Sequence, residues 1–364
     1  LTSMTKIFIL ILLATSSLGV SQNSTQETAQ NEYLLAENYY REGAYEKATQ
    51  LYKKLYNSSP FNAAYLGRLI SCYQETGAFL IAENLLKNKI KANKNQAYLY
   101  VFLGYNFEKQ QQKEKATLNY NLALSSLDKR VTYAANIGQL FKEYNLLDNA
   151  ILAYEKALKL NKNGTYNFQI AQIYGEKGDY KKMFESYIDL VDKNEQYFSL
   201  IQRYASKYIT EDPENEANVL FKKTLLRKSA SNPKEVWNVL LSWLFTQQKE
   251  YAKALTQEKA LFQRKPENLD AILTIGKIAF EDSSFNASMQ CFNFIIENSN
   301  AKNELINAHL YLIKIAIATK NPETKSLFER VFKQYGKNTA SLEIQVAYAT
   351  FLTFSENKPE EAIV

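Results

Sequence analysis

The chain has 364 residues, of which 46% are hydrophobic and 23% charged, and its formal net charge is +6. This balance excludes an intrinsically disordered chain. Lysines and arginines are interspersed with acidic residues, as in residues 108–115, which argues against a nucleic-acid-binding protein, because that class usually gathers its basic residues in one stripe. The 26 tyrosines and 20 phenylalanines, against 6 prolines and 11 glycines, favour long helices packed through large rings.

The first 21 residues are typical of an export signal. Lys6 precedes an apolar run over residues 7–13, and small and polar residues follow as far as Ser21. The apolar run is much shorter than the roughly 20 residues that a membrane-spanning helix needs. We therefore predict a signal peptide over residues 1–21, cleaved near Ser21 with Gly19 as the alternative, and a location in the periplasm or at the outer membrane of a bacterium. No cysteine lies near the cleavage region, so we expect no lipid anchor.

A repeated unit begins after residue 22. In its clearest copy, residues 131–163, two segments with apolar residues at helical spacing are joined by a short polar connection at Asn145. A small residue marks the second segment at an interval of 34 residues, at Ala48, Ala82, Ala116 and Ala150, and the series continues at Met183, Ala217, Ala254 and Ser288. The step from Ala217 to Ala254 is longer, which predicts extra residues near 229–233.

Large and small side chains recur in register with this series. A small residue occupies the first helix of seven units, at Ala36, Gly104, Gly138, Ala171, Ala205, Ser242 and Gly276, with Ile70 the exception. Three residues later comes a ring, at Tyr39, Tyr73, Phe107, Phe141, Tyr174, Tyr208 and Phe245, with Ala279 in the last unit. A bulky group also follows in the second helix, at Tyr52, Leu86, Tyr120, Tyr154, Tyr187, Phe221 and Phe292, where Glu258 departs from the pattern. Two helices pack without strain when each ring faces a small residue, so the pattern predicts stacked helix hairpins.

This pattern resembles the tetratricopeptide repeat family, whose period is also 34 residues, along residues 22–300. The resemblance implies an all-α fold, a right-handed α-solenoid of about nine to ten helix hairpins, of which eight are clear. Residues 301–364 indicate a divergent repeat and the start of a further, incomplete one. Because the sequence stops within a predicted helix rather than in a polar capping helix, we expect a fragment truncated at its C-terminus.

The sequence contains none of the usual catalytic or nucleotide-binding motifs. Carboxylate pairs such as Glu211 and Asp212 fall in polar connections rather than in an apolar pocket of the kind that catalytic carboxylates need. Cys72 and Cys291 lie too far apart in a stacked array for a disulfide, so we expect both to be reduced and buried. With His309 as the only histidine, no zinc site is expected. We predict a non-enzymatic protein without cofactor or metal.

In tetratricopeptide arrays the first helices line a concave groove, so the resemblance implies binding of a protein or peptide there. Helical periodicity assigns the following residues to that side: Tyr33, Glu37, Tyr40, Arg41, Tyr98, Val101, Tyr105, Glu108, Gln139, Lys142, Phe168, Gln172, Trp243, Lys277 and Phe280. The alternative is that some of these rings, Tyr105 and Trp243 among them, pack on a neighbouring first helix.

The family's carboxylate clamp of Lys, Asn and Arg is absent. The comparable positions hold Tyr33, Glu37, Gly67, Ser71, Val101 and Tyr105. We therefore expect an extended or helical segment held by aromatic residues rather than a C-terminal carboxylate.

Three hypotheses of function remain open. The first is an exported, non-enzymatic scaffold of a bacterial cell envelope that binds protein partners, with no nucleic acid and no transmembrane span. The second is a sensory or docking portion of a longer signalling protein or enzyme. The third is a carbohydrate-binding array, since aromatic grooves also stack on sugars.

Overall fold

The structure is a computed structural model that describes residues 28–93, 95–161 and 164–362. Within these ranges all regular elements are helices and none is a strand, which confirms the all-α prediction. The predicted signal peptide, residues 1–21, lies outside the described residues. None of the described helices combines the length and apolar character needed to cross a bilayer.

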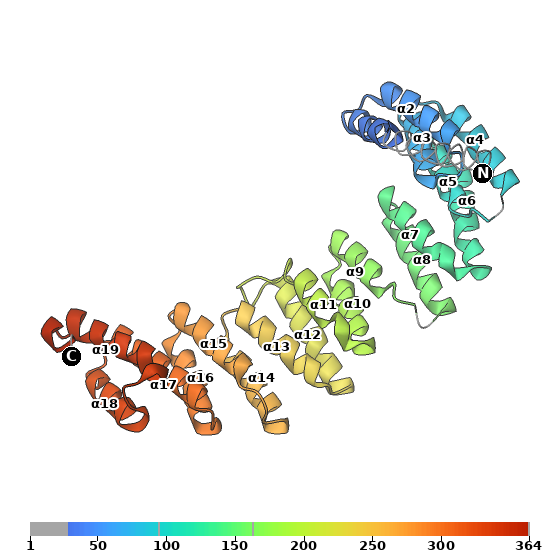
Figure 1. The fold of residues 1–364 in the computed structure, drawn as a ribbon. Coiled ribbons are helices and arrows are strands. Elements are labelled where there is room, and N and C mark those ends of the chain that lie inside the picture. The colour runs from blue at the N-terminus through green and yellow to red at the C-terminus, as the bar shows by residue number, and fades with distance from the viewer. Residues whose placement is uncertain (1–27, 94, 162–163, 363–364) are drawn as a thin grey trace, which may run out of the picture. The chain divides into compact units, whose positions relative to one another are not determined.

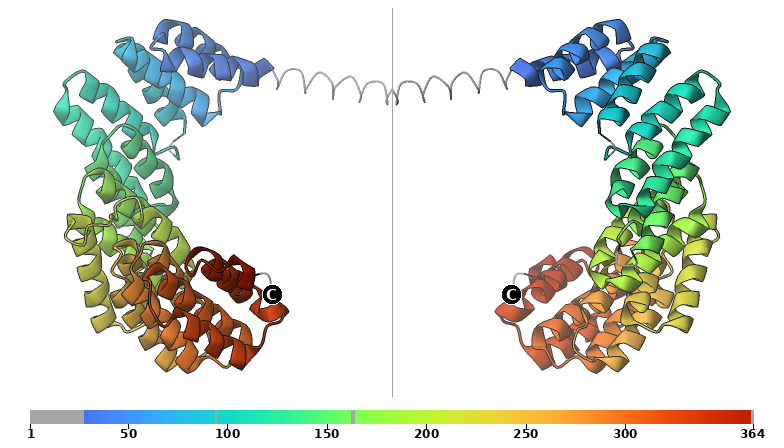
Figure 2. Two further views of the ribbon diagram at one scale, coloured as in Figure 1. Left: turned by 90° about the vertical axis from the view of Figure 1, so that its left-hand side faces the viewer. Right: turned by 90° about the vertical axis from the view of Figure 1, so that its right-hand side faces the viewer.

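The chain divides into two compact units, one as far as Ile173 and one from Tyr174 onward. Consecutive helices in each unit lie side by side as hairpins (Figures 1 and 2). Unit 1 holds a helix over residues 28–41 followed by α2 (Tyr45–Ser58), α3 (Ala63–Glu75), α4 (Phe79–Ala92), α5 (Leu99–Lys109), α6 (Lys113–Ser125), the 3-10 turns η1 (Ser126–Asp128) and η2 (Val131–Tyr133), α7 (Ala134–Glu143) and α8 (Leu147–Leu160). The next helix, α9 (Asn167–Glu176), spans the boundary.

Unit 2 continues the same alternation of first and second helices. It holds α10 (Tyr180–Lys193), η3 (Glu195–Tyr197), α11 (Phe198–Ala205), α12 (Glu216–Ser231), α13 (Glu235–Gln247), α14 (Tyr251–Arg264), α15 (Asp270–Glu281), α16 (Phe285–Asn298), α17 (Lys302–Ala318), α18 (Thr324–Tyr335), η4 (Thr339–Ser341), α19 (Leu342–Phe354) and η5 (Pro359–Ala362). Within residues 301–364, where a divergent repeat and the start of a further one were predicted, the long helices are α17, α18 and α19. An apolar cluster that includes Ile313, Phe328 and Ile344 joins these three helices.

The turn inside each hairpin has a repeated geometry. One residue takes the left-handed conformation, at Gly43, Gly77, Gln111, Asn145, Gly178, Lys249, Ser283 and Lys320. The N–H of the next residue then donates to a carbonyl five residues back, as from Leu146 to Phe141 at 2.8 Å. This closure satisfies the last carbonyls of the first helix and turns the chain sharply into the second. The polar break predicted at Asn145 is thus a helix cap.

The predicted packing of rings against small residues is confirmed. All eight residues of the series in the second helices are buried, seven of them small and one a methionine: Ala48, Ala82, Ala116, Ala150, Met183, Ala217, Ala254 and Ser288. A Cβ atom on Gly104 would lie 2.3 Å from the Tyr120 ring, and one on Gly138 would lie 2.4 Å from Tyr154. Only a residue without a side chain allows these rings to come so close. Cys72 and Cys291 are free and buried, as predicted.

One hairpin departs from the pattern. The extra residues predicted near 229–233 lengthen α12 to 16 residues, compared with 14 in α14. Its partner α11 is only 8 residues long and ends at Ala205, so the prediction that Tyr208 lies within a first helix is wrong. The buried Asn218 side chain holds the connection between the two helices by donating to the carbonyl oxygens of Thr210 at 2.8 Å and Asp212 at 2.6 Å. These bonds replace the tight turn used elsewhere.

Candidate functional site: a polar groove on the first helices of unit 1

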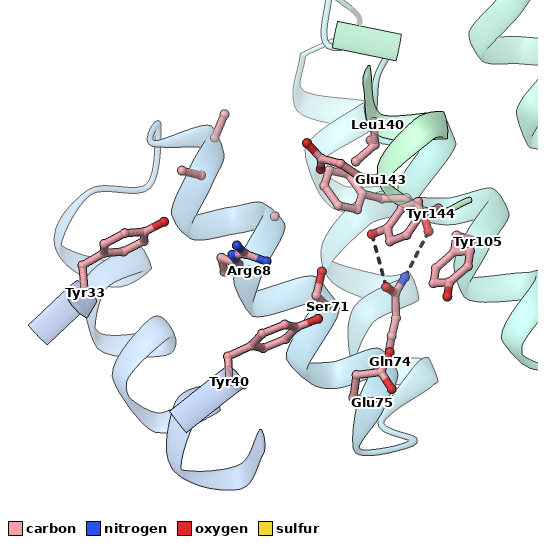
Figure 3. A pocket seen from close by; sticks show the side chains of 14 residues that line it. Tyr33, Tyr40, Arg68, Ser71, Gln74, Glu75, Tyr105, Leu140, Glu143 and Tyr144 are labelled. Atoms are coloured by element: carbon pink, nitrogen blue, oxygen red, sulfur yellow. Dashed lines mark hydrogen bonds between the residues drawn. The ribbon is translucent and has the colours of Figure 1, made fainter. Parts of the chain in front are cut away.

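A groove of about 720 Å³ opens across the first helices of unit 1 (Figure 3). The small side chains Ala63, Ala64 and Gly67 on the first half of α3 leave this space open. The lining residues come from the helix over residues 28–41, α3, α5 and the end of α7: Tyr33, Tyr40, Ala63, Ala64, Gly67, Arg68, Ser71, Gln74, Glu75, Phe102, Tyr105, Leu140, Glu143 and Tyr144. The surface therefore belongs to one face of four consecutive hairpins.

Arg68 is the cation on the groove wall, and its neighbours hold it in place. Its Nε and Nη2 atoms donate to the two carboxylate oxygens of Glu37 at 2.6 and 3.1 Å. The Tyr52 hydroxyl donates to the same carboxylate at 2.6 Å, and the guanidinium lies over the Tyr40 ring, 5.1 Å from its centroid. A two-point ion pair of this kind fixes the plane of the guanidinium. Arg68 is consequently a positioned donor rather than a mobile surface charge.

Gln74 ties three first helices together beneath the groove. The side chain is 3% exposed, its Nε2 donates to the Phe102 carbonyl of α5 at 3.2 Å, and its Oε1 accepts from the Tyr144 hydroxyl at 3.4 Å (Figure 3). Because a buried polar group is costly unless it is bonded, this amide favours one relative position of α3, α5 and the end of α7. The groove is therefore shaped before any ligand enters.

The aromatic rings of the groove already have intramolecular partners. Tyr105 and Tyr144 stack with centroids 3.8 Å apart, Lys109 lies over the Tyr105 ring, and Phe102 and Tyr144 form a T-shaped pair. Burial raises the pKa values of Tyr33, Tyr40 and Tyr144 above the ordinary value, so their hydroxyls stay protonated at neutral pH. The rings thus form a wall, and what they offer a ligand is mainly their hydroxyl groups.

Three of the residues predicted for the groove, Tyr33, Tyr40 and Tyr105, are brought together on its wall. The expectation that Glu37 faces the groove is wrong, because this residue is 8% exposed and lies behind Arg68. Val101 is fully buried and was also wrongly assigned. Both errors arise because the periodicity of one helix does not show that the next first helix covers part of its face.

The other predicted residues of unit 1 lie outside the groove lining. Arg41, Glu108 and Gln139 are exposed, Gln139 donating to Glu143 at 3.1 Å and Glu108 accepting from the Tyr120 hydroxyl. The rings of Tyr98 and Phe102 form a T-shaped pair. Lys142, Phe168 and Gln172 are partly buried.

In unit 2, the predicted residues pack on their neighbours. Trp243 meets Phe221 of α12 with ring centroids 6.1 Å apart. Lys277 lies over the Tyr311 ring, and Phe280 meets the same ring edge-on. Lys277 and Phe280 thus pack on a neighbouring first helix, α17, as the alternative stated, whereas Trp243 packs on a second helix, α12.

Sequence reasoning missed Arg68, Gln74, Glu143 and Tyr144. The first three lie next to the stripe that periodicity assigned to the groove, and Tyr144 follows the last residue of α7, where a connection was expected. Arg68 could have been predicted from the sequence. Gly67 and Ser71 lie within one turn of it on α3, and small residues leave room for a long side chain to reach the groove.

A family model for the tetratricopeptide repeat matches residues 131–163 and 165–196. These two segments are tetratricopeptide repeats. In unit 1 the first matched repeat contains α7 and α8, so the groove reaches the matched segment through Leu140, Glu143 and Tyr144. No curated protein matches the chain significantly.

Several solved structures of tetratricopeptide repeat proteins are similar to the chain. One, from Thermus thermophilus, is 18% identical, covers 49% of this chain and 97% of its own, and has a TM-score of 0.29. The C-terminal part of a repeat-containing protein from Cytophaga hutchinsonii is 13% identical, with coverages of 76% and 98% and a TM-score of 0.29. A protein from Parabacteroides merdae is 15% identical, with coverages of 69% and 98% and a TM-score of 0.26. At these identities the similarity concerns the repeat fold and says nothing of a ligand.

Proposed function

We propose that the protein is a non-enzymatic scaffold of a bacterial cell envelope that binds an extended peptide segment of a partner protein in the groove of unit 1. The observation that carries this proposal is the fixed set of hydrogen-bonding groups on the groove wall. Arg68 is held by Glu37, and Gln74 locks α3 to its neighbours. Preorganised donors and acceptors reduce the entropy cost of binding.

A peptide suits this wall better than a glycan does. A sugar ring stacks on an open aromatic face. The Tyr105 ring, however, is covered by the stacked Tyr144 ring and by Lys109, and the Tyr40 ring is covered by Arg68. An extended peptide instead presents alternating N–H and C=O groups, which the tyrosine hydroxyls, Ser71 and Arg68 can pair. Hydrogen bonding rather than ring stacking therefore supports the peptide proposal.

The non-enzymatic part of the proposal rests on structural ion pairs, which involve every charged residue of the groove lining except Glu143. Arg68 pairs with Glu37, and Glu75 accepts from Lys109 at 3.1 Å. Groups committed to structural pairs in this way are poor general acids or bases. The proposal would fall if the purified protein turned over a substrate and the Ala64→Trp variant described next abolished that turnover.

Filling the groove tests the binding function. Ala64 is exposed and lines the groove, so Ala64→Trp adds a large ring there without removing an existing contact. Ala92, the exposed last residue of α4, gives the matched control Ala92→Trp. Cross-linking in an envelope extract, followed by mass spectrometry, should show peptides joined to wild type and Ala92→Trp but not to Ala64→Trp. Equal recovery by all three proteins would refute binding in this groove.

Export is a separate part of the proposal, and the apolar run of residues 7–13 behind Lys6 supports it. Residues 1–30 fused to alkaline phosphatase should give periplasmic activity in a Gram-negative host. Replacing Ile9 and Leu12 by Arg should abolish that activity, because charges interrupt the apolar core. Activity that is absent from the unaltered fusion would remove the envelope location and leave the groove unaffected.

A further inference from the structure

The charges around the groove are not balanced. Arg68 is compensated by Glu37, and Glu75 by Lys109. Glu143 is different: it accepts from the Gln139 amide at 3.1 Å, and of the ion pairs that the structure describes within residues 28–93, 95–161 and 164–362, none joins it to a lysine or arginine. Two cations and three carboxylates leave an excess of one negative charge, although the whole chain has a net charge of +6.

We infer that the groove selects an extended peptide that places a lysine or arginine side chain against Glu143. This inference rests on the proposed function and names the chemistry of its partner. Glu143 is exposed and lines the groove beside Tyr144, so a ligand cation can reach it without breaking an existing ion pair. An acidic ligand residue at that point would meet a like charge.

The opposite wall suits the peptide backbone. A guanidinium has five N–H hydrogens: the contacts with Glu37 use the one on Nε and one on Nη2, and Tyr33 takes one more. At least two therefore remain for an acceptor. Because Glu37 already neutralises Arg68, a second carboxylate gains little there, whereas a neutral carbonyl oxygen accepts without repulsion from Glu37. Arg68 therefore anchors the main chain, and Glu143 selects the side chain.

Selection from random peptides tests this directly. A phage library displaying 12-residue peptides is first passed over the Ala64→Trp variant, and the phages that bind it are discarded. The remaining phages are then selected for binding to the wild-type protein. Enriched peptides are synthesised with a fluorescent label, and their Kd values are measured by anisotropy for wild type, Glu143→Gln and Glu143→Lys. Glu114→Gln, at an exposed acidic residue of α6 that does not line the groove, is the matched control.

We expect enriched peptides to share a lysine or arginine, and Glu143→Gln to weaken their binding about two- to fivefold, the usual size for an exposed ion pair. Glu114→Gln should leave Kd unchanged. Glu143→Lys should weaken binding further, and replacing the peptide's basic residue by glutamate should restore binding to that variant. This reciprocal rescue is a result that a merely structural role of Glu143 would not give.

Two other outcomes separate the inference from the proposed function. Peptides that need an open groove but bind equally to wild type and Glu143→Gln would overturn the inference and leave groove binding intact. A library that yields no peptide discriminating wild type from Ala64→Trp would overturn groove binding itself, and the inference with it.

Discussion

The hairpins α7/α8 and α13/α14 have the same plan but different side chains at the point of closest approach. In the first, Gly138 faces the Tyr154 ring, which is 2% exposed. In the second, the buried Ser242 hydrogen-bonds to Glu258, which stands at the repeat position that holds the ring in the first. The comparison shows that the repeat spacing fixes where two helices meet, whereas the residue placed there decides how strongly they are held and how that strength depends on pH.

The largest expected effect is the removal of the ring in the first hairpin. Tyr154→Ala should lower the free energy of unfolding by about 3–5 kcal/mol, because it deletes a buried aromatic side chain and leaves a cavity beside Gly138. Urea denaturation followed by circular dichroism measures this, and hydrogen exchange in α7 and α8 localises it. A loss as small as that caused by Glu258→Ala would contradict the difference between the two hairpins.

A smaller effect is expected when the glycine is filled. A Cβ atom on Gly138 would lie 2.4 Å from Tyr154, so Gly138→Ala should cost about 1–3 kcal/mol by overpacking. In the Tyr154→Ala background the same change should become favourable, because the space is free and alanine is the better helix former by about 1 kcal/mol. A double-mutant cycle measures this coupling, and additive effects would refute direct contact between the two positions.

The second hairpin should respond to pH instead. Burial raises the pKa of Glu258, and a hydrogen bond with Ser242 opposes that shift. Since the folded pKa lies above the unfolded one, the stability contributed by this carboxyl group is complete below the unfolded pKa, about 4.5, and is lost as the pH rises through the folded value.

Glu258→Gln should therefore stabilise the protein by about 1 kcal/mol at pH 7 and have little effect at pH 4. Thermal unfolding at both pH values measures this difference, with Glu114→Gln, on the exposed face of α6, as the control. An equal effect at pH 4 and pH 7 would contradict the assignment of the shift to burial of the carboxyl group.

The smallest effect concerns the turns of the same two hairpins. Asn145 and Lys249 both have a φ of 57°, a conformation that disfavours residues with a Cβ atom. Lys249 also pairs with Glu211 and Asp282, so Lys249→Ala serves as the reference that removes those contacts alone. Lys249→Gly should be more stable than Lys249→Ala by about 1 kcal/mol in urea denaturation. Equal stability would indicate that the turn can relax.

The sequence predicted the fold well because the interactions that build it are local. The period of 34 residues, the small residues and the rings all reflect contacts within one hairpin or with the next. Every residue of the series from Ala48 to Ser288 in the second helices is buried. The short helix α11 escaped prediction because Asn218 organises its connection through bonds that no hydrophobic pattern reveals.

The groove was predicted only in part because it depends on contacts between first helices. Tyr33, Tyr40 and Tyr105 follow from periodicity, but Glu37 follows the same pattern and is buried by its pairing with Arg68. Gln74 and Tyr144 form a hydrogen bond although they are 70 residues apart in the sequence. The periodicity of a single helix cannot predict a contact between residues so far apart.

Hydrogen exchange with a selected peptide bound tests the central claim most directly, because it shows which side of the hairpin stack is covered. The groove is built from first helices, so binding should slow amide exchange in α3, α5 and α7, and exchange in α4, α6 and α8 should stay unchanged. Protection confined to α4, α6 and α8 would show that the ligand binds the outer side, and the groove would then not be the binding site.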